Sequence, residues 1–413
     1  MGKVAKQTSH LPFLDGLRGL MALWVLVGHT IGAVGGWLPP FSHPGSAVDV
    51  FMLNSGLLMA YYFRVREEKE PWESPVSWFN FYVRRFFRIA PAYYLLLLVA
   101  VIFRHQLQWC AYETLTALPR APQAHPVVIA ALPAPLTGMD VLTHLSFTFG
   151  LFPKYAVTSV LPDWSIALEM QFYMALPFIM LLYRRAGHFL STALLIAIWA
   201  AANHFISFGP DMPPKLLGSF PMAAFLPLKL NCFVVGILLA ESYHSKDRNP
   251  ARSVLLCLLG IVLIRYTFDK YAAVTACFVT VMLIYRGDSA PAVVRNLLAW
   301  GRGIMGSRFA VFLADTSYGV YLFHLLVLWP FGAWLSSQPA FRRLPVTERF
   351  LLLLGMVVLV AYPVAFLLHR YVEQPGIKIG KRFIRQSKPV LRFQNEHRSI
   401  ARLAGVVPEI VPQ

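Results

Sequence analysis

Long apolar runs separated by short polar segments recur along the 413-residue chain. About 20 consecutive apolar residues suffice for a helix to cross a bilayer. By this measure the sequence predicts ten spans, although the second, seventh and eighth are short. Their approximate ranges are 13–36, 47–63, 87–103, 165–183, 188–207, 221–241, 253–267, 271–285, 309–335 and 348–369. We therefore predict an all-α polytopic membrane protein.

One further apolar stretch, residues 127–152, does not fit a span. Pro133, Pro135 and Gly138 interrupt it, which is typical of a loop. We interpret it as part of a long loop that is re-entrant or lies at the membrane interface.

The Lys and Arg residues favour one orientation of the ten spans. Of the 37, the termini and the loops on their side hold 26, the opposite loops hold 8, and 3 lie within spans. The positive-inside rule then places both termini in the cytoplasm. We predict a cytoplasmic leader at residues 1–12, a transmembrane domain at 13–370, and a basic, partly disordered cytoplasmic tail at 371–413.

Composition supports a multi-pass protein of the cell membrane and argues against a nucleic-acid-binding one. The chain is 57% hydrophobic and 14% charged, whereas soluble domains carry about 25% charged residues. Because topology explains most of the net charge of +17, the remaining basic character fits an anionic cytoplasmic ligand or lipid headgroups. The four cysteines show no metal-binding spacing, so we expect no metal site and no disulfide framework.

The first span carries two ionisable residues on one face. Arg18 and His29 are eleven residues apart, which on a straight helix is within about 20° of the same face and about 16 Å along the axis. Ionisable groups inside a membrane helix usually face a cavity or a partner. The structural alternative is that Arg18 reaches the headgroups and His29 is a buried, hydrogen-bonded side chain.

Three more ionisable residues are predicted at a similar depth in the outer half of the membrane, on three other spans. They are Asp49, Glu169 and His324. Each also has a structural interpretation. Asp49 could cap its helix, and Glu169 could be a neutral carboxyl bonded to Ser165 and Tyr173. A polar stripe that joins helices would account for His324. The agreement in depth favours one shared site.

A cytoplasmic cluster of arginines precedes the third span. In WFNFYVRRFFRIAPAYYL, Arg84, Arg85 and Arg88 lie among aromatic residues, and Pro91 fits the first turn of a helix. Guanidinium groups bind phosphate bidentately, and aromatic rings suit a flat heterocycle. Ordinary positive-inside anchoring is the alternative explanation.

Six sequence motifs together resemble the acyltransferase-3 family of integral membrane acyltransferases. In chain order they are FLDGLRGLMALWVLVGH, VDVFMLNSGLLM, VRRFFRIAPAY, WSIALEMQFYMALP, SYGVYLFHLLV and RYVEQP. They extend from Asp15 to Pro375, which is nearly the whole chain. One departure is Asn54, where the family usually has an apolar residue. This departure bears on the choice of acceptor more than on the chemistry.

The resemblance implies transfer of an acyl group, usually acetyl from acetyl-CoA, to a hydroxyl of a carbohydrate such as a cell-surface polysaccharide or glycolipid. Acyl-CoA, this acceptor and membrane lipids are thus the expected partners, with no metal. The family's functional residues correspond here to Arg18, His29, Arg85, Arg88, Glu169 and His324.

Combining the resemblance with the residue chemistry gives hypothetical roles. The donor's phosphates would bind Arg84, Arg85 and Arg88, with Arg18 next along the path. His29 would take the proton of the acceptor hydroxyl. Glu169 or Asp49 would orient that imidazole, and His324 would stabilise the oxyanion or place the acceptor.

Other functions remain open from sequence alone. In a transporter, the same intramembrane charges would form a proton or substrate path. The absence of obvious repeats and the arginine-rich loop count against that reading. Within the enzyme class, a succinyl donor or a small macrolide-like acceptor is equally compatible with the motifs.

Overall fold

The computed structural model describes residues 12–67, 69–122, 136–209, 212–246, 249–284 and 292–385. Predictions for the leader, for most of the basic tail and for the first part of 127–152 concern residues outside these ranges. The described remainder of 127–152 contains a short helix, Gly138–Leu145, and a 3-10 turn, Phe149–Leu151.

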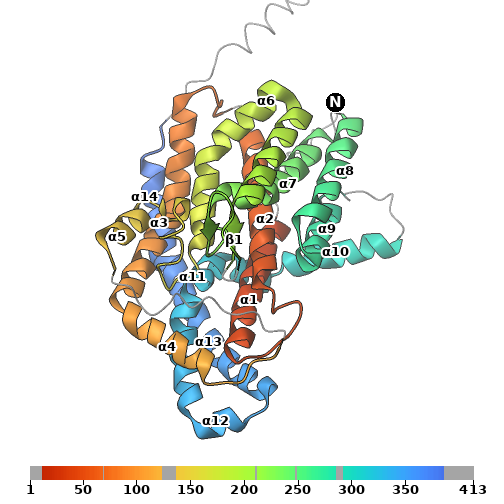
Figure 1. Cartoon of the computed structure of the whole chain (residues 1–413). Coiled ribbons are helices and arrows are strands. Elements are labelled where there is room, and N and C mark those ends of the chain that lie inside the picture. Colours follow the sequence, from red (N-terminus) through yellow and green to blue (C-terminus); the bar gives the residue numbers. More distant parts are fainter. Residues whose placement is uncertain are drawn as a thin grey trace, which may run out of the picture.

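Helices form most of the described chain (Figure 1). They are α1 (Pro12–Ala33), α2 (Pro44–Arg66), α3 (Pro75–Ile102), α4 (Arg104–Thr116), α5 (Gly138–Leu145), α6 (Trp164–Phe205), α7 (Leu226–Ser245), α8 (Pro250–Thr267), α9 (Lys270–Ile284), α10 (Ala292–Met305), α11 (Arg308–Ser337), α12 (Pro339–Arg343), α13 (Val346–Leu368) and α14 (Gln374–Arg382). Short 3-10 and π segments lie at Phe149–Leu151 and His369–Glu373. Strand β1 (Ser207–Phe208) pairs in parallel with β2 (Ser219–Phe220).

The all-α membrane fold is confirmed. Seven of the described helices are long and apolar enough to cross a membrane, by length and composition: α1, α3, α6, α7, α8, α11 and the continuous helix Val346–Arg382. Helix α6 has 42 residues and bends at Gly187, where φ is 77°. It therefore provides the two neighbouring spans predicted at 165–183 and 188–207. The total number of spans and the side of the termini stay predictions.

Two helix boundaries and one predicted loop differ from the sequence prediction. Helix α3 begins at Pro75, so Pro91 lies inside it and the arginine cluster lies on helix instead of in a loop. The last helix runs past residue 370 to Arg382 through the π turn. The predicted loop 286–308 contains α10, which lies across the direction of most other helices (Figure 1). Hydropathy marks where a helix is apolar and not where its backbone hydrogen bonds end.

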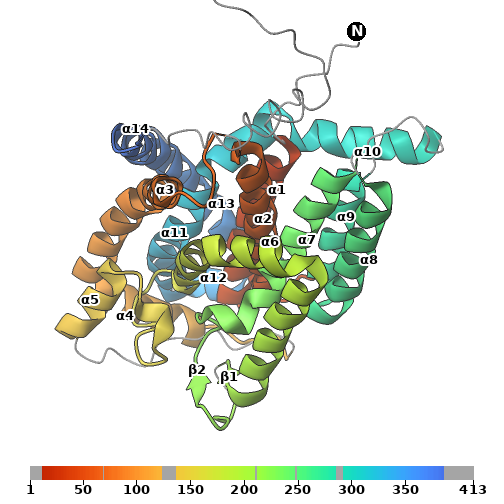
Figure 2. The same cartoon turned by 90° about the horizontal axis from the view of Figure 1, so that it is seen from above.

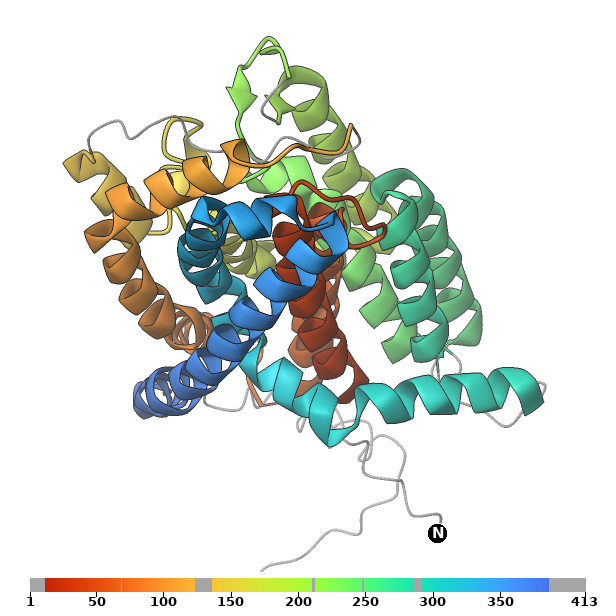
Figure 3. The same cartoon turned by 90° about the horizontal axis from the view of Figure 1, so that it is seen from below.

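Helices α1 and α2 occupy the middle of the molecule, between α3 and α14 on one side and α7, α8 and α9 on the other (Figure 2). Seen from below, α12 and α13 (blue) lie across the lower ends of the central helices (Figure 3). Helix α1 packs along α11, and α2 packs along α7. A Cβ on Gly19 would lie 2.6 Å from the backbone carbon of Leu313. Glycine is therefore what allows α1 and α11 to touch.

Candidate active site

His29 of α1 and His324 of α11 are hydrogen-bonded to each other. The Nδ1 atom of His29 lies 2.8 Å from Nε2 of His324. The rings are almost parallel, at 10°, with centroids 5.1 Å apart. His324 is 1% exposed, and His29 is half-buried. The structure thus brings together two of the four residues that were predicted to share a site.

The surroundings of His324 determine which nitrogen carries each proton. Its Nδ1 lies 2.8 Å from the carbonyl oxygen of Tyr321 and 3.1 Å from that of Val320. Carbonyls only accept, so Nδ1 of His324 is protonated and, in the neutral ring, Nε2 is the acceptor. His29 must then donate from its own Nδ1, which leaves Nε2 of His29 as a free base. Among the described residues, none is hydrogen-bonded to that Nε2.

Two of the predicted roles do not match these bonds. The hydrogen-bond partner of His29 is His324, where Glu169 or Asp49 was expected. Both nitrogens of His324 are already bonded, so stabilising an oxyanion does not fit this side chain.

Glu169 belongs to a separate cavity at the level of Arg18. Its carboxylate accepts hydrogen bonds from the hydroxyls of Tyr173 and Ser55. The cavity is partly open, and the space within it, open part included, is about 530 Å³. Its wall consists of Arg18, Val48, Phe51, Met52, Ser55, Ser165, Ile166, Glu169, Phe233, Ser317, Tyr318 and Tyr321. The expected bond from Tyr173 is present, whereas the other expected partner, Ser165, bonds elsewhere.

Tyr321 connects this cavity to the histidine pair. Its side chain lines the cavity, and its hydroxyl lies 2.7 Å from Oγ of Ser165. Its backbone carbonyl accepts the proton of His324, and its ring centroid lies 6.2 Å from that imidazole. Tyr321 therefore lies between the cavity and the histidine pair.

Asp49 is paired with Lys229 of α7. The ammonium lies 2.7 and 2.9 Å from the two carboxylate oxygens. Helix α2 starts at Pro44 with His43 at the cap, so the interpretation of Asp49 as a helix cap was wrong. A charge buried among helices needs an opposite charge, and Lys229 supplies it. The predicted common site thus divides into a histidine pair, a carboxylate cavity and an ion pair.

The three arginines predicted to bind a donor have different environments. Arg84 is 2.8 Å from a carboxylate oxygen of Glu70, and Arg88 is 2.8 Å from the fully buried Glu373. The guanidinium of Arg85 lies over the ring of Tyr173, 5.7 Å from its centroid, and its buried Nε has no hydrogen-bond partner. Of the three, Arg85 is the one without a carboxylate partner among the described residues.

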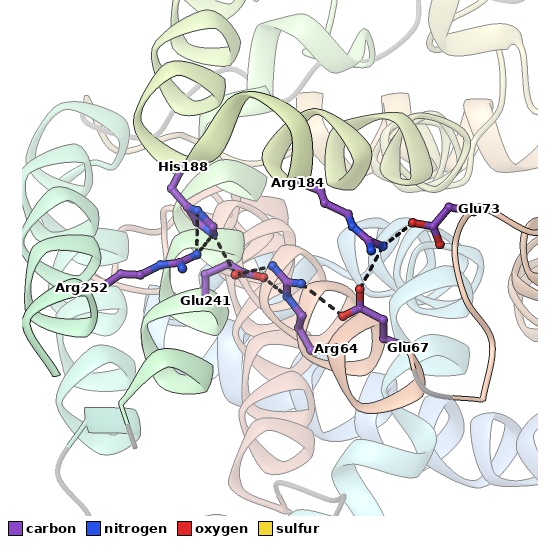
Figure 4. A network of polar contacts seen from close by, with 7 residues as sticks. All are labelled: Arg64, Glu67, Glu73, Arg184, His188, Glu241 and Arg252. Atoms are coloured by element: carbon purple, nitrogen blue, oxygen red, sulfur yellow. Dashed lines mark hydrogen bonds and ion pairs between the residues drawn. The ribbon is translucent and has the colours of Figure 1, made fainter. Parts of the chain in front are cut away.

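Further cations at the same end of the helices are also neutralised, as Figure 4 shows. Arg64 holds both oxygens of Glu241 at 2.8 and 2.9 Å. The same Glu241 accepts from His188 at 2.8 Å, and His188 contacts Arg252. Since Asp49–Lys229 and Arg64–Glu241 join the starts and the ends of α2 and α7, these two helices are parallel and held at both ends.

The sequence contained a signal for three of the residues whose contacts were not predicted. Lys229 is a lysine in an apolar span, which by itself implies an acidic partner. Glu373 lies in the RYVEQP motif, and only its role was missing. Tyr321 lies in the SYGVYLFHLLV motif, but its contact with the cavity was not predicted, because an aromatic residue in a membrane helix is usually part of the packing.

Comparison with known proteins identifies the family of this chain. The sequence profile of the acyltransferase-3 family, described as an acyltransferase domain, matches residues 11–368. The chain belongs to the acyltransferase-3 family. Residues 11–368 thus form the acyltransferase domain of a multi-pass membrane protein, which favours an enzyme over a transporter.

Two relatives show what this chain resembles. Peptidoglycan O-acetyltransferase OatA of Listeria monocytogenes is 21% identical over 96% of this chain. BcsY, a proposed membrane-bound transacylase of Komagataeibacter xylinus, is 34% identical over 41% of it. The alignments span 61% and 36% of these relatives. No solved structure matches.

Proposed function

We propose that this acyltransferase moves an acyl group, in the simplest case acetyl, from acyl-CoA to a hydroxyl of a cell-surface carbohydrate or glycolipid. The observation that carries the proposal is the hydrogen bond from His29 to His324. The bond leaves Nε2 of His29 unprotonated. The other nitrogen of the same ring, Nδ1, donates to the neutral imidazole of His324. General bases for hydroxyl groups need such a nitrogen near neutral pH.

The reaction would proceed by direct transfer. Nε2 of His29 takes the proton of the acceptor hydroxyl while the oxygen attacks the thioester carbonyl. The C–S bond then breaks, and the leaving thiolate takes that proton back from Nε2. The positive charge on His29 during the reaction is stabilised by its Nδ1–H bond to His324. This positioning role resembles that of the carboxylate in a catalytic triad, with a weaker acceptor.

The donor would approach from the arginine-rich end of the helices. Arg85 is the strongest candidate for a phosphate of the donor, because it has unused donors and no carboxylate partner among the described residues. The cavity at Arg18 and Glu169 would then hold the pantetheine arm. Arg84 and Arg88 would position the surrounding helices through Glu70 and Glu373. In the orientation that the basic residues predict, this end is cytoplasmic and the histidine pair lies towards the outside.

Transfer of radiolabelled acetyl from acetyl-CoA to cell-envelope glycan in membrane vesicles tests the proposal. His29→Ala should abolish transfer while the protein stays inserted and folded. His105→Ala, which changes an exposed histidine, is the matched control. Full transfer by His29→Ala would overturn the assignment. Parallel reactions with succinyl-CoA, and with a macrolide as acceptor, identify the acyl group and the acceptor class.

A further inference from the structure

Helix α10 (Ala292–Met305) lies across the lower ends of α8 and α9 and extends past them (cyan in Figure 3). It packs on the bundle through one face, which consists of Leu298, Gly301 and Met305, all buried. A Cβ on Gly301 would lie 3.2 Å from Cζ of Phe278 in α9, so glycine allows this close packing. The proposed reaction uses none of these residues.

A stripe of apolar side chains runs along the exposed side of α10. Its members are between 44% and 79% exposed: Val293, Leu297, Trp300 and Ile304. At 100° per residue, all four fall within about 60° of one another, and the stripe lies about 100° around the helix from the buried face. Apolar residues that are exposed singly are ordinary, but a continuous stripe over three turns indicates an interaction surface.

Arginines occupy the side of α10 opposite the apolar stripe. By helical spacing, Arg295 and Arg302 lie about 180° from the stripe. A third arginine, Arg308, follows the helix, and residues 292–308 contain no Asp or Glu. Arg295 and Arg308 are exposed. The surface therefore combines an apolar face with a purely basic one, which complements an anionic partner with an apolar part.

A hydrogen bond determines which face of α10 is directed towards the bilayer. Arg302 donates from Nη2 to the carbonyl oxygen of Met282 across 2.9 Å. Met282 lies in the last turn of α9, and the last carbonyls of a helix point out of its end. The arginine side of α10 therefore lies beyond the end of α9. The apolar stripe, on the other side, is directed back along α9 towards the middle of the bilayer.

We propose that α10 binds the surface of an anionic membrane, with the apolar stripe among the acyl chains and Arg295 and Arg308 at the lipid phosphates. Helices that lie in a membrane interface have a basic face opposite an apolar face with bulky side chains. Trp300 fits this position, because indole rings favour the level of the headgroups. In the orientation that the basic residues predict, the lipids belong to the cytoplasmic leaflet.

Fluorescence quenching of the full-length protein in lipid nanodiscs tests the proposal. The bimane label is placed at Leu297→Cys in a Cys277→Ala background, which lacks the exposed native cysteine. Lipids brominated near the top of their chains should quench this label, and acrylamide in the water should not. At Ala299→Cys, about 160° further around the helix, the two quenchers should exchange effects. Leu258→Cys, exposed in the middle of α8, should respond most to bromine near the chain end.

The Leu297→Cys label also tests the charge of the lipid. In equal mixtures of phosphatidylglycerol and phosphatidylcholine, brominated one at a time, quenching should show phosphatidylglycerol enriched roughly fivefold, the effect of one arginine at an anionic surface. Joint replacement of Arg295 and Arg308 by Gln should remove most of this enrichment. The matched control is Arg343→Gln, which changes an exposed arginine of α12 and should leave the enrichment unchanged.

Three results would overturn the proposal. Quenching of the Leu297→Cys label by acrylamide would place the stripe in water. Quenching by neither agent would mean that a protein covers it. Equal amounts of the two lipids near the label would remove the role of the arginines. His29→Ala should give the same quenching as the parent protein, so loss of acyl transfer cannot be mistaken for loss of membrane binding.

Discussion

Nδ1 of His29 donates to Nε2 of His324 across 295 positions of sequence. The bond gives the two histidines different environments. His29 has a free Nε2, whereas His324 accepts from Nδ1 of His29 and so fixes the orientation of the His29 ring. The two residues should therefore respond differently to substitution.

Replacing His324 should slow the chemical step without weakening donor binding. We expect His324→Ala to lower kcat by roughly 10²–10⁴, the usual contribution of a positioned acid–base group, with KM for acyl-CoA little changed. His324→Gln retains an acceptor for Nδ1–H of His29 and should recover part of the rate. Steady-state kinetics with purified enzyme measure both parameters. A rise in KM with kcat intact would place His324 in substrate binding.

Arg85 and Arg84 are adjacent in sequence, but only Arg84 is paired with a carboxylate. Arg85→Ala should raise KM for acyl-CoA by roughly ten- to a hundredfold, since a charge-assisted hydrogen bond contributes about 1.5–3 kcal/mol. Arg84→Ala should leave KM nearly unchanged and instead lower thermal stability through loss of the bond to Glu70. The same kinetic assay, with melting temperatures of both variants, checks this. If the two variants raised KM equally, both arginines would bind the donor, as the sequence predicted.

The Asp49–Lys229 pair should be structural. Asp49→Asn leaves the lysine unpaired among the helices, which typically costs about 3–5 kcal/mol. The double variant Asp49→Asn with Lys229→Met should recover much of the melting temperature. Activity per folded molecule should stay near the wild-type value. A large fall in kcat for the stable double variant would show that Asp49 takes part in catalysis, as the sequence suggested.

The contact between α1 and α11 depends on Gly19. Gly19→Ala should separate the two helices and cost about 1–3 kcal/mol, as overpacking of a filled interior does. It should also lower kcat, because the histidine pair lies further along the same interface. Gly45→Ala is the matched control, since a Cβ there meets nothing within 4 Å. If Gly19→Ala melted at a lower temperature than Gly45→Ala but had the same kcat, the contact between His29 and His324 would not depend on the spacing of α1 and α11.

Asp163 should make stability depend on pH. Burial raises the pKa of this carboxyl to about 6, against the opposing effects of His144, Tyr93 and Ser159. The native state therefore holds a proton that the unfolded chain releases near pH 4. Below pH 4 this carboxyl does not lower the free energy of unfolding. As the pH rises past 6, it lowers that free energy by about 3 kcal/mol.

Asp163→Asn should consequently stabilise the protein more at pH 8 than at pH 4.5. Melting temperatures at the two pH values measure the difference, and Asp315→Asn, at an exposed carboxylate, is the control. A variant that is equally stabilised at both values would contradict the pKa of Asp163.

The positions of most long helices could be predicted from the sequence, and the site residues that it proposes stay predictions. Hydropathy located the helices because each must be apolar over the thickness of the membrane, whatever its neighbours are. Even the bend of α6 was visible, as the basic pair Arg184 and Arg185 before Gly187. The family motifs then indicated which polar residues to consider as candidates.

The partners of those residues were decided only by the tertiary structure. Helical spacing and depth placed Asp49, Glu169 and His324 at one level, but depth says nothing about rotation of a helix or about which helices touch. Gly19 lets α1 meet α11, so His29 finds His324. Because α2 packs on α7, Asp49 forms its ion pair with Lys229 and not with a residue of the histidine pair. Local sequence determines which groups enter the membrane, and helix packing determines which of them can react together.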